Sequence, residues 1–274
     1  MNVVWAALIV GAATAAAVAS LLLVRRHAPE RGFFQDGDRA AGVFGVIATG
    51  FSVLLGFIVF LAFTSYDQSR SGAEQEALVV VQQVEDAQLF PQPAGAQLTG
   101  ELVCYARSVV NGEWRGMQDG TLGDSINPWG VKLFRTLQGV QPRTPSQQSA
   151  YDKWLDQTST REEARRDRVH GAVGVIPATL WIALFFIAGV IFVFTLFFAD
   201  REETPVVQGL LAGSIVAVMT VLLLLLHGLD HPFDHGVGGL KPVAMQRSLR
   251  MVDDALGSVG VRLQPPCNGL GVPR

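Results

Sequence analysis

The sequence predicts an all-α integral membrane protein, with four transmembrane helices in two hairpins and a helical extramembrane domain. Four apolar runs carry this prediction, and none has an ionisable side chain in its interior: residues 3–24, 42–65, 172–199 and 206–226. A polar stretch, residues 67–170, separates the second run from the third. Each run has the roughly 20 residues that an α-helix needs to cross a hydrocarbon core about 30 Å thick. Helices are expected because lipid offers the backbone no hydrogen bonds.

The composition excludes several classes of function. Hydrophobic residues make up 49% of the 274 residues and charged residues only 16%, below the roughly 25% usual for soluble domains. A net charge of -3, with no basic run among aromatics, argues against nucleic-acid binding. The chain has no phosphate-binding glycine loop, HExxH, GxSxG or CxxC motif. We therefore expect no enzymatic activity and no cofactor.

The first hairpin, residues 1–66, begins with a span that we interpret as a retained signal anchor. No basic segment precedes the apolar run, which is longer than the apolar core of a signal peptide. Arg25 and Arg26 follow it directly. A cleavable signal peptide is the alternative interpretation.

The second span is expected to continue into the extramembrane domain as one long helix. No proline interrupts the chain after this span, and apolar residues recur there at helical spacing: Ala73, Ala77, Val80, Val81 and Val84. Pro91 and Pro93 are expected to end the helix.

The extramembrane domain, residues 67–170, is expected to contain further helices. Asn127–Pro128 and Thr144–Pro145 each have the pattern of an N-cap followed by proline in the first helical position. A domain of this size has a small core, so it is expected to pack on itself or on neighbouring subunits.

The second hairpin is expected over residues 171–228, and a tail over residues 229–274 with a short amphipathic helix near residues 243–256. In the fourth span Gly209, Gly213 and Ala217 lie four residues apart. Such small residues let helix backbones approach closely. The sequence does not decide whether these small residues contact a helix of the same chain or a helix of a neighbouring subunit.

The two cysteines and the basic residues bear on orientation. With four spans, Cys104 and Cys267 lie on the same side of the membrane. A disulfide between them would require the oxidising, extracytoplasmic face, and two free thiols are the alternative. Basic residues of the first loop place that loop in the cytoplasm by the positive-inside rule: Arg25, Arg26, Arg31 and Arg39. We favour a multi-pass protein of the plasma (inner) membrane with an extracytoplasmic domain, although four arginines before the third span argue for the reverse: Arg161, Arg165, Arg166 and Arg168.

A histidine pair suggests a metal site. His227 and His231 lie at i, i+4, a spacing that can seat one transition metal on a helix face. The alternative is a solvated turn in which Asp230 bonds the local backbone.

Two stretches resemble the bestrophin-like membrane family, bacterial and plant proteins catalogued as a domain of unknown function. The first is LLGFIVFLAFTSYD at residues 54–67, and the second is LDHPF at residues 229–233 followed by LKP at residues 240–242. The resemblance covers nearly the whole chain. Residues 52–59 are also similar to the neck of true bestrophins, pentameric chloride-type channels whose second membrane helix lines the pore.

This resemblance implies a homo-oligomer, with five subunits as in bestrophins, that lies in the lipid bilayer and passes small inorganic ions. By position, Thr49, Val53 and Phe57 would face the pore. Phe57 and Phe60 could form a hydrophobic constriction that gates by dewetting, whereas lipid-facing or packed aromatics are the alternative. In a symmetric ring Asp67, Glu74 and Glu76 would form an acidic pore mouth that concentrates cations, whereas a solvated helix face is the alternative.

The chain departs from the bestrophin pattern at several positions, and these departures limit the properties that the resemblance implies. The Arg-Trp-Trp that follows the neck helix in bestrophins is replaced by Thr64, Ser65 and Tyr66, and the chain has no clear acidic calcium clasp. Calcium gating is therefore not implied. The competing hypothesis is a non-conducting membrane sensor or scaffold whose extramembrane helical domain binds an envelope partner.

Overall fold

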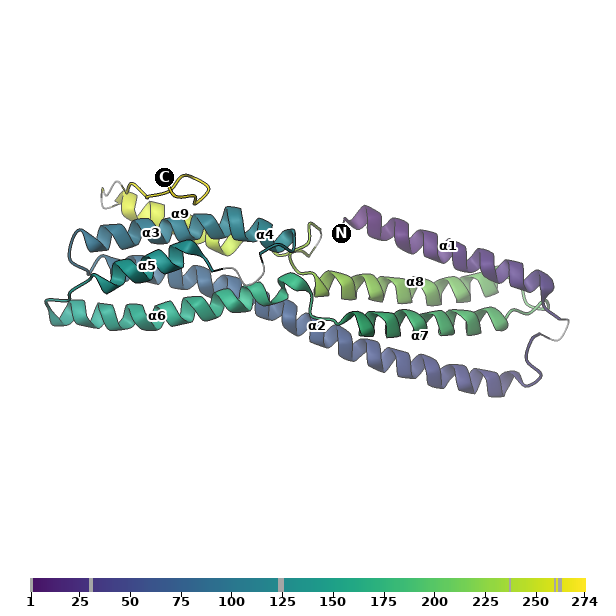
Figure 1. Ribbon diagram of the computed structural model, residues 1–274. Helices are drawn as coiled ribbons and strands as arrows, with labels where there is room; N and C mark the ends of the chain where they lie inside the picture. The colour runs from purple at the N-terminus through teal and green to yellow at the C-terminus, as the bar shows by residue number, and fades with distance from the viewer. Residues whose placement is uncertain (1, 30–31, 123–125, 237, 259, 261–262) are drawn as a thin grey trace. The chain divides into compact units, whose positions relative to one another are not determined.

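The computed structural model describes residues 2–29, 32–122, 126–236, 238–258, 260 and 263–274. Regular secondary structure in these residues is helical (Figure 1), which confirms the predicted class. In chain order the helices are α1 Val3–His27, α2 Gly37–Ala87, α3 Ala94–Ser108, the π-helical turn η1 Val109–Glu113, α4 Trp114–Gln118, α5 Pro128–Gln138, α6 Pro145–His170, the 3-10 turn η2 Gly171–Val173, α7 Ala178–Phe197, α8 Pro205–Asp230 and α9 Val243–Ser258.

Four of these helices, α1, α2, α7 and α8, are long and apolar enough to span a membrane. The third span begins later than predicted, at Ala178 rather than residue 172. Gly174 adopts a left-handed φ of +70°, and Pro177 precedes the first helical residue. Because proline favours extended backbone in the residue before it, the chain enters α7 only after this turn.

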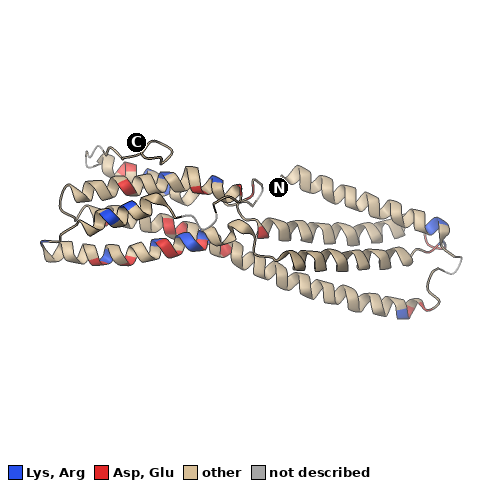
Figure 2. Cartoon of the chain, in the orientation of Figure 1, with Lys and Arg blue, Asp and Glu red and all other residues tan. Residues whose placement is uncertain are grey.

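The chain divides into two compact units. The apolar unit comprises Met1–Thr64, Gly174–Asp230 and His235–Gly238, and the polar unit comprises Ser65–Val173, His231–Asp234 and Gly239–Arg274. In Figure 2 the charged residues of the apolar unit lie near helix ends, whereas those of the polar unit lie along the helices themselves.

In the apolar unit, α1 packs closely against α8. A Cβ atom built on Gly213 would lie 3.3 Å from side-chain carbons of Thr14 and Val18, and one built on Gly209 would lie 3.4 Å from Val18. These glycines therefore serve helix contact within one chain. A second cluster joins α2 to α7 and α8 through buried apolar residues: Phe51, Leu55, Ile58, Ala62, Leu184, Ile191 and Leu226.

The polar unit is a helical bundle around the second half of α2. Its core collects buried side chains from α2, α3, α5, α6 and α9, among them Val80, Val84, Leu102, Leu133, Trp154 and Val252. The two predicted N-caps are present. Asn127 Oδ1 accepts from the Trp129 N–H at 2.9 Å, and Thr144 Oγ1 accepts from the Gln147 N–H at 3.2 Å.

The predicted long helix is also present, since α2 runs without interruption from Gly37 to Ala87. It ends four residues before Pro91. Its residues up to Thr64 belong to the apolar unit, and those from Ser65 onward belong to the polar unit.

The C-terminal tail is fastened to α3 and α5 of the polar unit. Cys267 forms a disulfide with Cys104, 163 residues earlier. The Trp129 indole N–H donates to the Gly271 carbonyl at 2.6 Å. Gly271 has a left-handed φ of +80°, and a Cβ there would lie 2.4 Å from Ser108 N, so only glycine fits this approach.

Candidate functional site

One face of α2 is left uncovered within the single chain. Val53 is 55% exposed, and Phe57 and Phe60 are each 66% exposed. Thr49, one turn earlier, is also exposed. The other face of the same helix is packed, with Leu55 only 3% exposed. All four residues predicted to line a pore therefore lie on the open face.

Steps of three or four residues along α2 carry this open face from Thr49 to Glu74. Its residues change from apolar at Phe57 and Phe60 to acidic at Asp67, whose side chain is exposed. Of the acidic residues predicted at a pore mouth, Asp67 and Glu74 are exposed, whereas Glu76 is fully buried and does not belong to this face.

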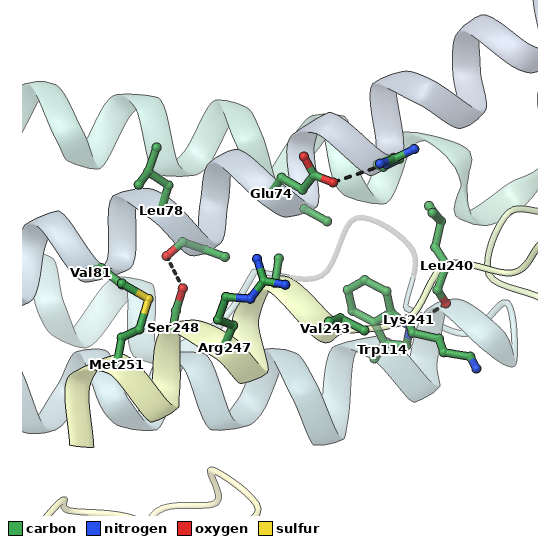
Figure 3. A pocket seen from close by; sticks show the side chains of 14 residues that line it. Glu74, Leu78, Val81, Trp114, Leu240, Lys241, Val243, Arg247, Ser248 and Met251 are labelled. Atoms are coloured by element: carbon green, nitrogen blue, oxygen red, sulfur yellow. Dashed lines mark hydrogen bonds and ion pairs between the residues drawn. The ribbon is translucent and has the colours of Figure 1, made fainter. Parts of the chain in front are cut away.

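Glu74 does not present an isolated charge. Its Oε1 lies 3.2 Å from Nε of Arg70, one turn earlier on α2, and both side chains are about 60% exposed. Figure 3 shows Glu74 at one side of a groove of about 450 Å³, across from Arg247 on α9. Lys241 also lines the groove. Cations near Glu74 reduce the negative potential expected from the sequence alone.

A network of charged residues lies at the centre of the polar unit. Arg168 of α6 has no exposed side-chain surface, and neither has its partner Glu76 of α2. The Arg168 guanidinium donates from Nε and Nη2 to the two Glu76 oxygens, and also from Nη2 to Glu113. Tyr105 donates its hydroxyl to Glu76. Arg165 pairs with Glu113 at 2.9 Å.

The network sets the ionisation of its members. Burial alone would raise the pKa of Glu113, but the charges of Arg168 and Arg165 outweigh burial and lower that pKa below its usual range. Burial alone would lower the pKa of Arg168, but Glu76 and Glu113 raise it. Burial and then Glu76 raise the pKa of Tyr105 well above its usual value. The Glu113 carboxylate is therefore charged and Tyr105 is neutral at physiological pH.

The predicted histidine pair is divided by the end of a helix. Because α8 ends at Asp230, His231 lies past its last residue, whereas the His227 ring contacts Trp181. Over the ranges that the structure describes, no group of three or more His, Cys, Asp or Glu side chains is arranged to hold a metal ion.

Asp230, the last residue of α8, binds backbone that is distant in the sequence. It is 3% exposed and accepts hydrogen bonds from the backbone N–H groups of Val175 at 2.7 Å and Ile176 at 2.9 Å. The Trp181 indole N–H also donates to it at 3.3 Å. The last residue of α8 thus fixes the segment that leads into α7.

Sequence reasoning missed the charged network. The sequence analysis uses the arginines before the third span only as evidence on membrane orientation. The i, i+4, i+7 spacing of Arg161, Arg165 and Arg168 puts them on one face of α6. That spacing was the available signal. It does not reveal the partners, which come from α2 and η1.

Comparison with known proteins gives the family. The family model of the Bestrophin-like domain matches residues 11–244. No curated protein matches the chain in sequence. A solved bacterial bestrophin homologue from Klebsiella pneumoniae, carrying a single substitution, is similar with a TM-score of 0.69 and 12% identity, over 89% of this chain and 98% of that one. Another substituted form of the Klebsiella pneumoniae homologue is similar with a TM-score of 0.66 and 13% identity, over 90% of this chain and 99% of that one. At such identities the structures show a shared fold, and the match of the family model shows that this chain belongs to the Bestrophin-like family.

Proposed function

We propose that the protein is a homo-oligomeric ion channel whose pore is lined by the open face of α2. The observation that carries this proposal is the exposure of an apolar stripe on a helix whose other face is packed. Family membership and the shared fold agree with it. In a ring of subunits, Val53, Phe57 and Phe60 would form a hydrophobic constriction that closes the path by excluding water.

The first test is the oligomeric state, because an axial pore requires several copies of α2. Native mass spectrometry of the protein in nanodiscs is expected to give a closed ring, with five subunits as in bestrophins. A monomer or simple dimer would rule out the axial pore and favour a membrane sensor or scaffold.

The second test removes the constriction. Phe57→Ala is expected to raise the open probability or conductance in planar bilayer recordings, because a smaller side chain widens and wets the narrowest part. Phe186→Ala on α7 is the matched control, since Phe186 is similarly exposed at 70%. Unchanged conductance and gating of Phe57→Ala in a conducting protein would contradict the assignment.

We also propose that the polar unit is extracytoplasmic. The Cys104–Cys267 disulfide supports this orientation, because such bonds persist in oxidising compartments. Alkaline phosphatase fused after Arg274 is expected to be active in a bacterial host, and green fluorescent protein at the same place is expected to be dark. The reverse pattern would put the polar unit in the cytoplasm.

A further inference from the structure

A pocket of about 400 Å³ lies between α5 and α6 of the polar unit. One side of it is cationic, with Arg161, Arg165 and Arg166 on α6. The other side is apolar, with Ile126, Val131 and Phe134, which are 75%, 42% and 48% exposed. Its volume is within the range of small-molecule sites, about 300–1,000 Å³.

Arg161 is the unusual residue of this pocket. It is only 1% exposed, and its Nη1 donates to Gln83 Oε1 at 2.6 Å. Its guanidinium carbon lies 4.9 Å from the centre of the Tyr105 ring. Among the residues that the structure describes, its other two nitrogens, Nε and Nη2, find no hydrogen-bond partner. A buried guanidinium stays charged, and leaving its donors unpaired is costly.

The carboxylates of the network do not neutralise Arg161. Glu76 accepts from Arg168 and Tyr105, and Glu113 accepts from Arg165, Arg168 and Asn127 (Asn127 Nδ2 at 2.8 Å). Within the part of the chain that the structure describes, both carboxylates pair with Arg165 or Arg168, and neither forms an ion pair with Arg161. Glu162 also lines the pocket, but it is exposed and its charge is solvated.

The two unpaired nitrogens indicate which anion would fit. Nε and Nη2 form one edge of the guanidinium, where two parallel N–H groups match the two oxygens of a carboxylate. Arg168, seven residues later on α6, uses this same edge for Glu76. In Arg161, which lines the pocket, this same edge is unpaired and buried.

We propose that this pocket binds a small organic carboxylate. The carboxylate would pair with the Nε–Nη2 edge of Arg161, and the apolar part of the ligand would lie against Phe134 and Val131. This site is separate from the open face of α2 and does not depend on ion conduction. It gives the polar unit a ligand-binding function.

The test is calorimetric titration of the full-length protein in nanodiscs with phenylacetate, phenylacetamide and inorganic phosphate. Phenylacetate is expected to bind, whereas its uncharged amide is expected to bind at least tenfold more weakly, because the amide cannot accept two N–H groups as an anion. Phosphate lacks an apolar part and is expected to bind more weakly than phenylacetate. Equal binding of the amide, or binding of phosphate alone, would overturn the proposal.

Two variants locate the site. Arg161→Gln is expected to weaken phenylacetate binding at least tenfold, whereas Arg250→Gln, at an exposed position on α9, is expected to leave it unchanged. Because Arg161 is buried, a second variant at an exposed position is needed. Phe134→Glu adds a repelling charge at the pocket and is expected to abolish binding in a folded protein. Unchanged binding in either folded variant, or no binding to the wild type, would overturn the proposal.

Discussion

The apolar and polar units are both helical, but the partners of their buried charged side chains differ in kind. In the apolar unit the buried acid Asp230 is satisfied by two backbone N–H groups and an indole N–H. In the polar unit Arg168, Glu76 and Glu113 are buried together as ions. Lipid-exposed helices gain from close packing of small residues, whereas a unit with a hydrated surface can keep charges inside if each is paired. The two units should therefore fail under different perturbations.

The largest loss of stability is expected when a member of the buried charged network is replaced. Glu76→Gln leaves the buried Arg168 with one carboxylate partner fewer, and breaking such a pair costs roughly 3–5 kcal/mol of unfolding free energy. Thermal unfolding followed by circular dichroism should show a large drop in Tm. A Tm within one or two degrees of the wild type would mean that the network does not stabilise the polar unit.

The next largest loss of stability is expected when the close packing of helices in the apolar unit is disturbed. Gly213→Leu places a side chain where even a Cβ lies 3.3 Å from Thr14 and Val18, so α1 and α8 must separate. Overpacking of this kind costs about 1–3 kcal/mol. Gly189→Leu on α7 is the control, because a Cβ there meets nothing within 4 Å. Equal Tm values for the two variants would show that the close α1–α8 contact does not determine the stability of the apolar unit.

Protonation of Glu113 alone should destabilise the polar unit by a smaller amount than the loss of Glu76, because Arg168 keeps its pair with Glu76. The pKa of Glu113 is lower in the folded chain than its usual 4.5. Its stabilising effect is therefore complete above pH 4.5 and is lost as the pH falls through the lowered folded-state value. The Tm of the wild type should fall over this window more steeply than that of Glu113→Gln. Parallel curves would contradict this assignment.

The smallest effect is expected at the surface of α2. Arg70 and Glu74 pair at 3.2 Å, but both side chains are about 60% exposed. Pairs of this kind on one helix contribute about 0.3–0.5 kcal/mol. Glu74→Gln should therefore leave the Tm almost unchanged, and a loss as large as that of Glu76→Gln would remove the distinction between surface and buried charge.

The spans and long helices could be predicted because their signals are local. Four apolar runs specify four membrane-length helices, and the lack of proline between residues 37 and 90 lets α2 run as one long helix. The charged network could not be predicted, because Glu76, Glu113 and Arg168 are far apart in sequence and each resembles a surface residue. The helix α7 begins six residues after the start of the predicted third span, because a turn at Gly174 interrupts a stretch that is apolar enough to be helical.

The disulfide has a consequence for biosynthesis. Cys104 emerges from the ribosome 163 residues before its partner, and both α7 and α8 lie between them in the chain. The tail can reach α3 only after those two helices have been made. Oxidation of this pair would thus mark chains whose last two apolar helices are complete, and a pulse-chase on a non-reducing gel would time that step.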